Sequence, residues 1–108
     1  AALRRGVPIA MGTDAGTPFN YHGDNAQELE RMVALGMTPM EAIMTSTSAA
    51  ARLLGLIQDI GSIAAGKQAD LLVVEGNPLR NIGVLLKRER IAGVMQRGRF
   101  VAGPLSRA

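Results

Sequence analysis

The chain has 108 residues, of which 47% are apolar, 19% charged and 3% aromatic, which suits one domain with a modest aliphatic core and is too short for most enzyme barrels. No apolar run approaches the roughly 20 residues that span a bilayer, and no charged-then-apolar leader opens the chain, so we expect a cytoplasmic protein without a membrane partner. The absence of cysteine excludes disulfides and thiolate metal sites.

The net charge of +3 is distributed unevenly along the chain. Residues 1–60 carry four Arg against six acidic residues, whereas residues 61–108 carry eight Lys or Arg against three acidic residues. The densest basic cluster, KRER at residues 87–90, contains a Glu and lacks the aromatic side chains on which bases stack. We therefore expect a solvated or interface surface there, and no nucleic-acid partner.

The first element that the sequence predicts is a buried strand over residues 7–11. The run VPIAM is short and nearly continuously apolar, as is typical of a parallel strand that is buried on both faces. Pro8 has no backbone N–H and should therefore lie at the start of this strand. Residues 12–23, which include Gly, Pro, Asn and Tyr, then predict a long loop, and loops that follow buried strands often carry functional sites.

Two or three helices are expected next. Each start is marked by side chains that can accept a hydrogen bond from a backbone N–H of the first turn. The TPME run at residues 38–41 is the strongest signal, because Thr38 and Glu41 can each bond the other's backbone amide. The predicted starts are Asp24 or Asn25 for a helix that reaches Gly36, Thr38 for a second helix, and the TSTS run at residues 45–48 for a short helix over AAARLLG.

The remainder of the chain predicts four or so short strands. The GSIAAGKQADLLVVEGNP segment, residues 61–78, has β-rich pieces at Ile63 and at residues 70–75, and the Gly-Asn-Pro turn closes it. The IAGVMQRGRFVAG segment, residues 91–103, predicts a hairpin with Arg97-Gly98 at its turn.

Asp14 follows the predicted strand with a glycine on either side, Gly12 and Gly16. A carboxylate at the C-terminal end of a parallel strand faces the mouth at which α/β barrels place their catalytic groups. An Asx turn, in which Asp14 bonds the amide two residues on and ends the strand, also explains this position. From position alone the Asx turn is the simpler interpretation, and both stay open.

His22 is the only histidine of the chain and lies in the predicted loop as YHGDN. It could bind a metal, move a proton or hold a substrate carboxylate, although a lone loop histidine is more often solvated or beside a helix cap. A catalytic zinc site ordinarily takes three protein ligands plus water, so one Asp and one His do not complete such a site.

The order of the motifs is more informative than any one of them. GTDAGTP is followed by HGDNAQELERMVALGMTPMEAI, TSTSAAARLLG, DIGSIAAGKQADLLVVEGNPL and VMQRGRFV. This colinear set resembles the C-terminal third of a metal-dependent amidohydrolase, within the imidazolonepropionase-like and prolidase-like branch, from about Gly6 to Val101.

The resemblance implies an α/β fold, in which a (β/α)8 barrel is joined to a small β-sandwich built from both termini. Residues 1–56 would be the last strand-and-helix part of the barrel, with residues 7–14 as its last strand and residues 24–54 as the following helices. Residues 57–108 would supply the C-terminal strands of the sandwich.

The resemblance also implies hydrolysis of a C–N bond in a small amide, such as a dipeptide, an N-acyl amino acid or a cyclic amide. One or two zinc ions would activate a water molecule in the full-length enzyme. Asp14 matches the strand-end aspartate that contacts the metal and accepts the proton of the attacking water, and His22 matches a histidine that we expect to line the substrate pocket.

Most of the implied site has no counterpart in this sequence. The His-x-His pair of the first strand, a bridging carboxylated lysine and two further metal-binding histidines are absent, and a barrel needs roughly 250 residues. We therefore expect a fragment that is inactive alone, need not bind metal, and self-associates as a homo-oligomer through exposed strand edges. The alternative is a noncatalytic module that self-associates or binds a partner.

Overall fold

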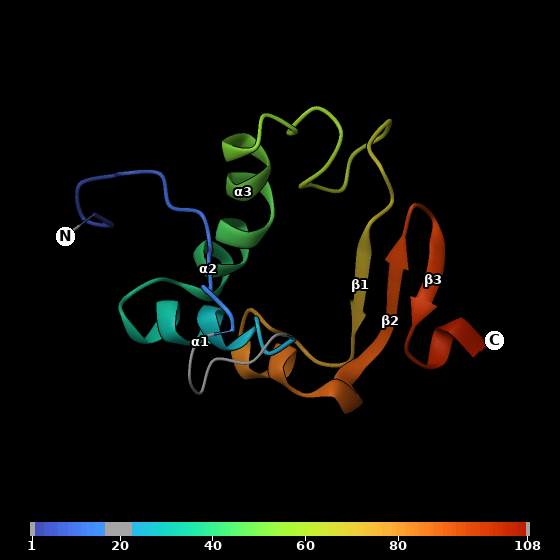
Figure 1. The fold of residues 1–108 in the computed structure, drawn as a ribbon. Helices are drawn as coiled ribbons and strands as arrows, with labels where there is room; N and C mark the ends of the chain where they lie inside the picture. The colour runs from blue at the N-terminus through green and yellow to red at the C-terminus, as the bar shows by residue number, and fades with distance from the viewer. Residues whose placement is uncertain (1, 17–22, 108) are drawn as a thin grey trace.

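The computed structural model describes residues 2–16 and 23–107, which build an α/β fold of helices and a three-stranded antiparallel sheet. In Figure 1 the helices lie on one side and the sheet on the other, with the C-terminus beside β3. No helix among the described residues is long and apolar enough to cross a membrane. The elements are α1 (Gln27–Ala34), α2 (Pro39–Ser46), α3 (Ser48–Leu53), β1 (Leu71–Val74), β2 (Ile91–Gln96) and β3 (Arg99–Ala102), with short 3-10 helices η1 (Ile82–Leu86), η2 (Arg88–Arg90) and η3 (Pro104–Arg107).

The capping box predicted at the start of α2 is confirmed. The Glu41 N–H donates to Thr38 Oγ1 over 3.2 Å, and the Thr38 N–H donates to Glu41 Oε1 over 3.4 Å. Pro39 is the first helical residue, where a missing N–H costs no intrahelical hydrogen bond. The start of α2 is therefore set by four consecutive residues.

The caps predicted for the other two helices are wrong. Ala26 precedes α1 and makes no side-chain capping bond, because the backbone carbonyls of Asp24 and Asn25 already accept from the first N–H groups of the helix. Thr47 precedes α3, but its hydroxyl donates backward to the carbonyl of Ile43 over 3.0 Å. The Thr47 side chain therefore stabilises the end of α2 and does not cap α3.

The strand predicted over residues 7–11 is not formed. Residues 7–14 belong to no strand, and the described sheet contains only antiparallel pairs formed by later segments. A parallel strand takes its hydrogen bonds from neighbouring strands, and none of the described residues supplies such a neighbour. Ile9 and Met11 nevertheless pack against the core, so the apolar pattern reports burial even though the strand is absent.

The sheet confirms the predicted hairpin. Gln96 lies opposite Arg99 across a turn in which Arg97 has a φ of 51° and Gly98 a φ of 81°. Two positive φ angles give the turn a twist that matches the flanking strands. β1 pairs with the other edge of β2, so the order is β1-β2-β3. The piece predicted at Ile63 forms no strand, and the described sheet has three strands where about four were expected.

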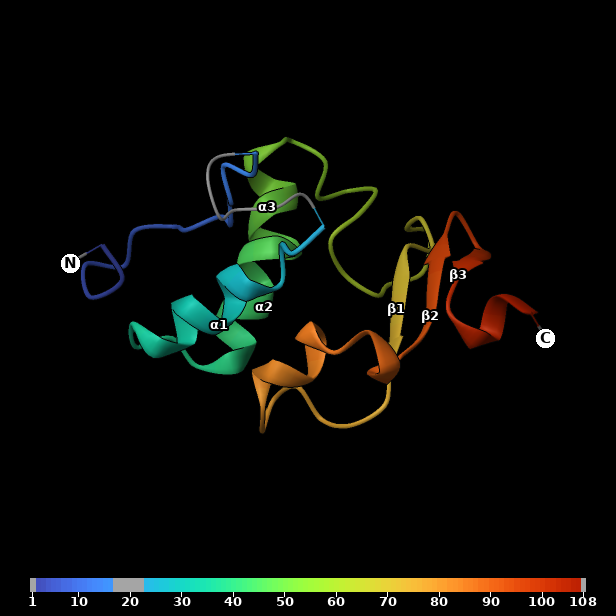
Figure 2. The ribbon, with the colours of Figure 1, turned by 60° about the horizontal axis from the view of Figure 1, so that its bottom comes forward.

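The buried core lies among the helices. Leu29, Met37 and Ala42 form one apolar cluster with Ile82, which comes from η1. In Figure 2 the orange 3-10 helices lie below α1 and connect toward the sheet. Ile82, which follows β1 in the sequence, packs in the core of the helices. This contact joins η1 to α1, two segments about 50 residues apart in the sequence.

Candidate functional site

Asp14 ends the extended segment in an unusual backbone conformation. Its φ is 50° and the φ of Gly16, two residues later, is 102°. Asp tolerates the left-handed region better than most residues because its short side chain can bond locally. The side chain is exposed at the end of the segment. This geometry is compatible with both interpretations of Asp14, the strand-ending turn and the ligand.

A backbone hydrogen bond joins the Asp14 segment to α2. The Met11 N–H donates to the Thr45 carbonyl over 2.8 Å. Thr45 is buried, and its own hydroxyl donates to the Ala42 carbonyl over 2.5 Å and lies 3.3 Å from Met32 Sδ in α1. The sequence does not indicate this contact, because the TSTS run predicts only helix ends.

His22, the other predicted site residue, lies outside the described residues. The structure therefore brings no second predicted site residue to Asp14, and the role expected for His22 stays a prediction.

The described residues do not complete a metal site. Among residues 2–16 and 23–107 there is no group of three or more His, Asp or Glu side chains that could hold a metal ion. Catalytic zinc takes three protein ligands and an open position, and divalent metals in general accept carboxylate oxygen. The metal role expected for Asp14 therefore stays a prediction.

Several grooves lie on the described surface, and two of them are the widest of those described. One of about 460 Å³ separates the segment at residues 8–10 from α3, where Leu53 is 77% exposed. Another of about 770 Å³ lies between the loop around residues 56–70 and the turn at Arg97-Gly98. Asp14 lines neither groove, so these hollows do not mark a pocket around the carboxylate.

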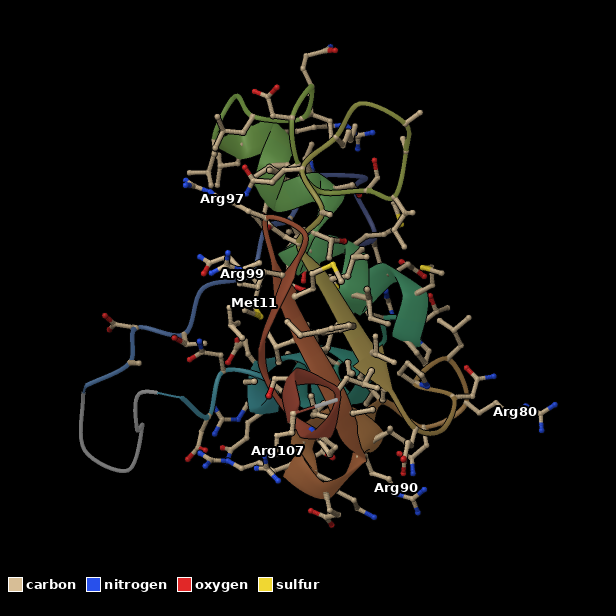
Figure 3. The ribbon with its side chains drawn as sticks, turned by 90° about the vertical axis from the view of Figure 1, so that its right-hand side faces the viewer. Met11, Arg80, Arg90, Arg97, Arg99 and Arg107 are labelled. Atoms are coloured by element: carbon tan, nitrogen blue, oxygen red, sulfur yellow. The ribbon has the colours of Figure 1, made fainter. Side chains whose placement is uncertain are left out.

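The basic side chains are spread over the surface. Figure 3 shows Arg80, Arg90 and Arg97 extending away from the ribbon at three separate places. Recognition of a nucleic-acid backbone needs a continuous basic patch or stripe. Residues 87–90 are exposed, as expected for a solvated or interface surface, and the expectation of no nucleic-acid partner stays a prediction.

Comparison with known proteins places the chain in a family. The amidohydrolase family model matches residues 1–101. Ochratoxinase of Aspergillus niger is 35% identical over 105 residues, which are 95% of this chain and 21% of that protein. Imidazolonepropionase of Shouchella clausii is 33% identical over 103 residues, 94% of this chain and 23% of that protein. A crystal structure of a Xaa-Pro dipeptidase with methionine bound in its active site superimposes with a TM-score of 0.86 at 42% identity, covering 94% of this chain and 24% of that one.

The fold and these matches define a hydrolase-family chain. The chain belongs to the amidohydrolase family, and its resemblance to the imidazolonepropionase-like and prolidase-like branch is confirmed. It spans between about a fifth and a quarter of the length of these relatives.

Proposed function

We propose that this chain is the C-terminal part of a metal-dependent amidohydrolase that cleaves a C–N bond in a small amide. The observation that carries the proposal is the match of the family model over residues 1–101, which includes the Gly-Thr-Asp segment at residues 12–14. In the complete protein, residues 7–14 would pair with neighbouring strands as the last strand of a (β/α)8 barrel. Residues 57–108, which include the antiparallel sheet, would form part of a β-sandwich.

Asp14 is the residue of this chain to which we assign the chemistry. Its carboxylate would accept the proton of the attacking water and pass it to the leaving nitrogen, the work of a general base and then a general acid. One or two zinc ions would supply Lewis-acid activation, with Asp14 as one ligand. The chain alone lacks the other ligands among its described residues, so we expect it to be inactive by itself.

The substrate class follows from the relatives by name only. The Xaa-Pro dipeptidase and imidazolonepropionase matches favour a dipeptide, an N-acyl amino acid or a cyclic amide as substrate. His22 would line the pocket that holds this substrate. A cytoplasmic location and a homo-oligomeric state belong to the same proposal.

The experiment is Asp14→Asn in the protein expressed from its complete reading frame. The wild-type and variant enzymes are assayed with zinc against methionyl-proline, N-acetyl-methionine and imidazolonepropionate, by following release of the amine or opening of the ring. We expect kcat to fall by at least ~10²-fold, since the amide cannot accept the proton. Asp24→Asn is the matched control, because only the backbone carbonyl of Asp24 is used at the start of α1.

Two results would contradict the proposal. Activity of Asp14→Asn within a few-fold of wild type would remove Asp14 from proton transfer. Absence of zinc-dependent turnover of every amide in the panel, by a folded wild-type protein, would favour the noncatalytic module instead. That alternative draws on the sheet, where Leu72 is 50% and Val101 is 53% exposed.

A further inference from the structure

The groove of about 770 Å³ lies between the loop that precedes β1 and the turn of the β2–β3 hairpin. Its lining combines two basic side chains, Lys67 and Arg97, with apolar side chains that include Leu56 and Ile60. All of its lining residues belong to residues 56–98. The groove is therefore built by this loop and this hairpin, and it needs no strand from another part of the protein.

Hydrogen bonds hold the two sides of the groove together. The Arg97 N–H donates to Asp70 Oδ1 over 2.9 Å, and the Gly98 N–H donates to the Ala69 carbonyl over 2.9 Å. The other carboxylate oxygen of Asp70, Oδ2, accepts from Gln68 Nε2 over 2.6 Å. Arg97 and Asp70 are 27 residues apart in the sequence, so these bonds fix the hairpin turn relative to the loop.

Arg97 occupies a backbone conformation that does not suit arginine. Its φ of 51° lies in the left-handed region, where Asn, Asp and Gly are favoured in two-residue hairpin turns. Arg therefore costs stability at this position that Asn would not cost. Residues that are held in such conformations by their surroundings occur often at functional sites. The presence of Arg97 therefore indicates a use for its guanidinium group.

The cationic groups of Arg97 and Lys67 have no anionic partner in this chain. Neither lies within ion-pair distance of a carboxylate in the part of the chain that the structure describes. Lys67 Nζ donates to the Ser62 hydroxyl over 2.6 Å, and an ammonium group has two further N–H donors. The acidic side chains of the groove, Asp59 and Asp70, disfavour a ligand with several negative charges. This balance favours a ligand with one negative charge over a dianion.

We propose that this groove binds a small carboxylate with an apolar body. The carboxylate would pair with Arg97 and Lys67, since a guanidinium group can donate two parallel N–H bonds to a carboxylate and an ammonium group adds a point charge. The apolar body would lie against Leu56 and Ile60. The inference does not depend on the chemistry proposed for Asp14, because Asp14 does not line this groove.

The first measurement is chemical modification of the full-length protein, read residue by residue by mass spectrometry. Phenylglyoxal modifies arginine, and an N-hydroxysuccinimide ester of acetate modifies lysine. We expect hexanoate to slow modification of Arg97 and Lys67, and hexanol, its neutral analogue, to leave it unchanged. Arg99 and Lys87 are the internal controls, because both are exposed and neither lines the groove.

Three results of this measurement would overturn the inference. Hexanoate could leave Arg97 and Lys67 unprotected, or it could protect Arg99 and Lys87 to the same extent. Equal protection by phosphate or chloride at the same ionic strength would remove the carboxylate assignment.

The second measurement repeats the modification in variants of the two basic residues. In Lys67→Gln, protection of Arg97 should need at least ~10-fold more hexanoate, as expected when a hydrogen bond to a charged group is lost. Arg97→Asn should weaken protection of Lys67 in the same way, whereas Arg99→Asn should not. Unchanged protection in both Lys67→Gln and Arg97→Asn would contradict the proposed contacts.

The Arg97→Asn variant also tests whether Arg97 costs stability. We expect slower hydrogen exchange of backbone amides in a peptide covering residues 94–99, because Asn suits the positive φ of the turn. Arg97→Gly, which also accepts this φ, replaces Arg97→Asn where the asparagine variant does not fold, with the same expected loss of hexanoate protection at Lys67. Faster exchange in a folded Arg97→Asn protein would overturn the argument that Arg97 is held against its backbone preference.

Discussion

The helices of this chain contain buried apolar residues and the strands of the described sheet contain none, although both also expose large apolar residues, and Leu53 in α3 is 77% exposed. Ala42 is fully buried and Ala51 and Leu29 nearly so, whereas Leu72 and Val73 in β1 are 50% and 40% exposed. Both parts have regular hydrogen bonding. The strands pair through their backbones, but none of the buried apolar side chains of the described residues lies in the sheet. The exposed side chains of Leu72 and Val73 are therefore available for contacts that the described residues do not make.

The position that connects the two parts should show the largest effect. Ile82 is 5% exposed and belongs to the core cluster of the helices, although it follows β1 in sequence. We expect Ile82→Ala to lower the free energy of unfolding by about 3 kcal/mol, as for other buried aliphatic side chains. Leu72→Ala in β1 is the control and should cost less than ~1 kcal/mol. Both are measured by urea unfolding followed by circular dichroism, and similar costs would contradict the contrast in burial.

Two glycines of the loop after α3 provide a smaller and sharper test. A Cβ on Gly61 would lie 2.6 Å from Ala51 Cβ, whereas a Cβ on Gly66 would meet nothing within 4 Å. Both residues have positive φ, 95° and 87°, so Ala costs about 1 kcal/mol at either position through backbone strain. We expect Gly61→Ala to lower the free energy of unfolding by about 2 kcal/mol more than Gly66→Ala in the same assay, because the new methyl group would also clash with Ala51 in α3. Equal costs would mean that this loop does not rest on α3.

The capping box tests whether local signals stabilise the helical part. Thr38→Ala removes the acceptor of the Glu41 N–H and should cost about 1 kcal/mol. Thr47→Ala, at the start of α3, removes no capping bond but only an exposed hydroxyl bond to the Ile43 carbonyl, and should cost less. Thermal unfolding of both variants measures the difference, and an effect at Thr47 as large as that at Thr38 would contradict the assignment of caps.

The exposed sheet should affect association more than stability. We expect the 108-residue chain to self-associate at micromolar concentration, because β1 has one unpaired edge within the described sheet and exposed apolar side chains. Leu72→Lys should reduce the mass seen by light scattering while changing the unfolding free energy by less than ~0.5 kcal/mol. Arg80→Lys is the control substitution. A wild-type chain that is a folded monomer under these conditions would contradict the expectation.

Features whose partners lie within a few residues were predictable from the sequence. The capping box joins Thr38 to Glu41, and the hairpin turn at Arg97-Gly98 depends on two adjacent residues. The helix cap predicted at Asp24 or Asn25 is wrong even though it is a local feature. At Asp24 the backbone carbonyl, and not the side chain, accepts the hydrogen bond from the first turn of α1. The candidate ligand Asp14 was found from its motif, and its role remains a proposal.

The sequence by itself determined the family, the capping box at the start of α2 and the hairpin. The capping box and the hairpin turn were predictable because short-range hydrogen bonds depend little on the rest of the chain. The tertiary structure decided that residues 7–11 form no strand, that Ile82 joins the helical core, and that the Thr45 carbonyl receives Met11. Each of these depends on a partner far away in the sequence. Apolar spacing predicts that a residue is buried, whereas only the fold determines which distant segment buries it.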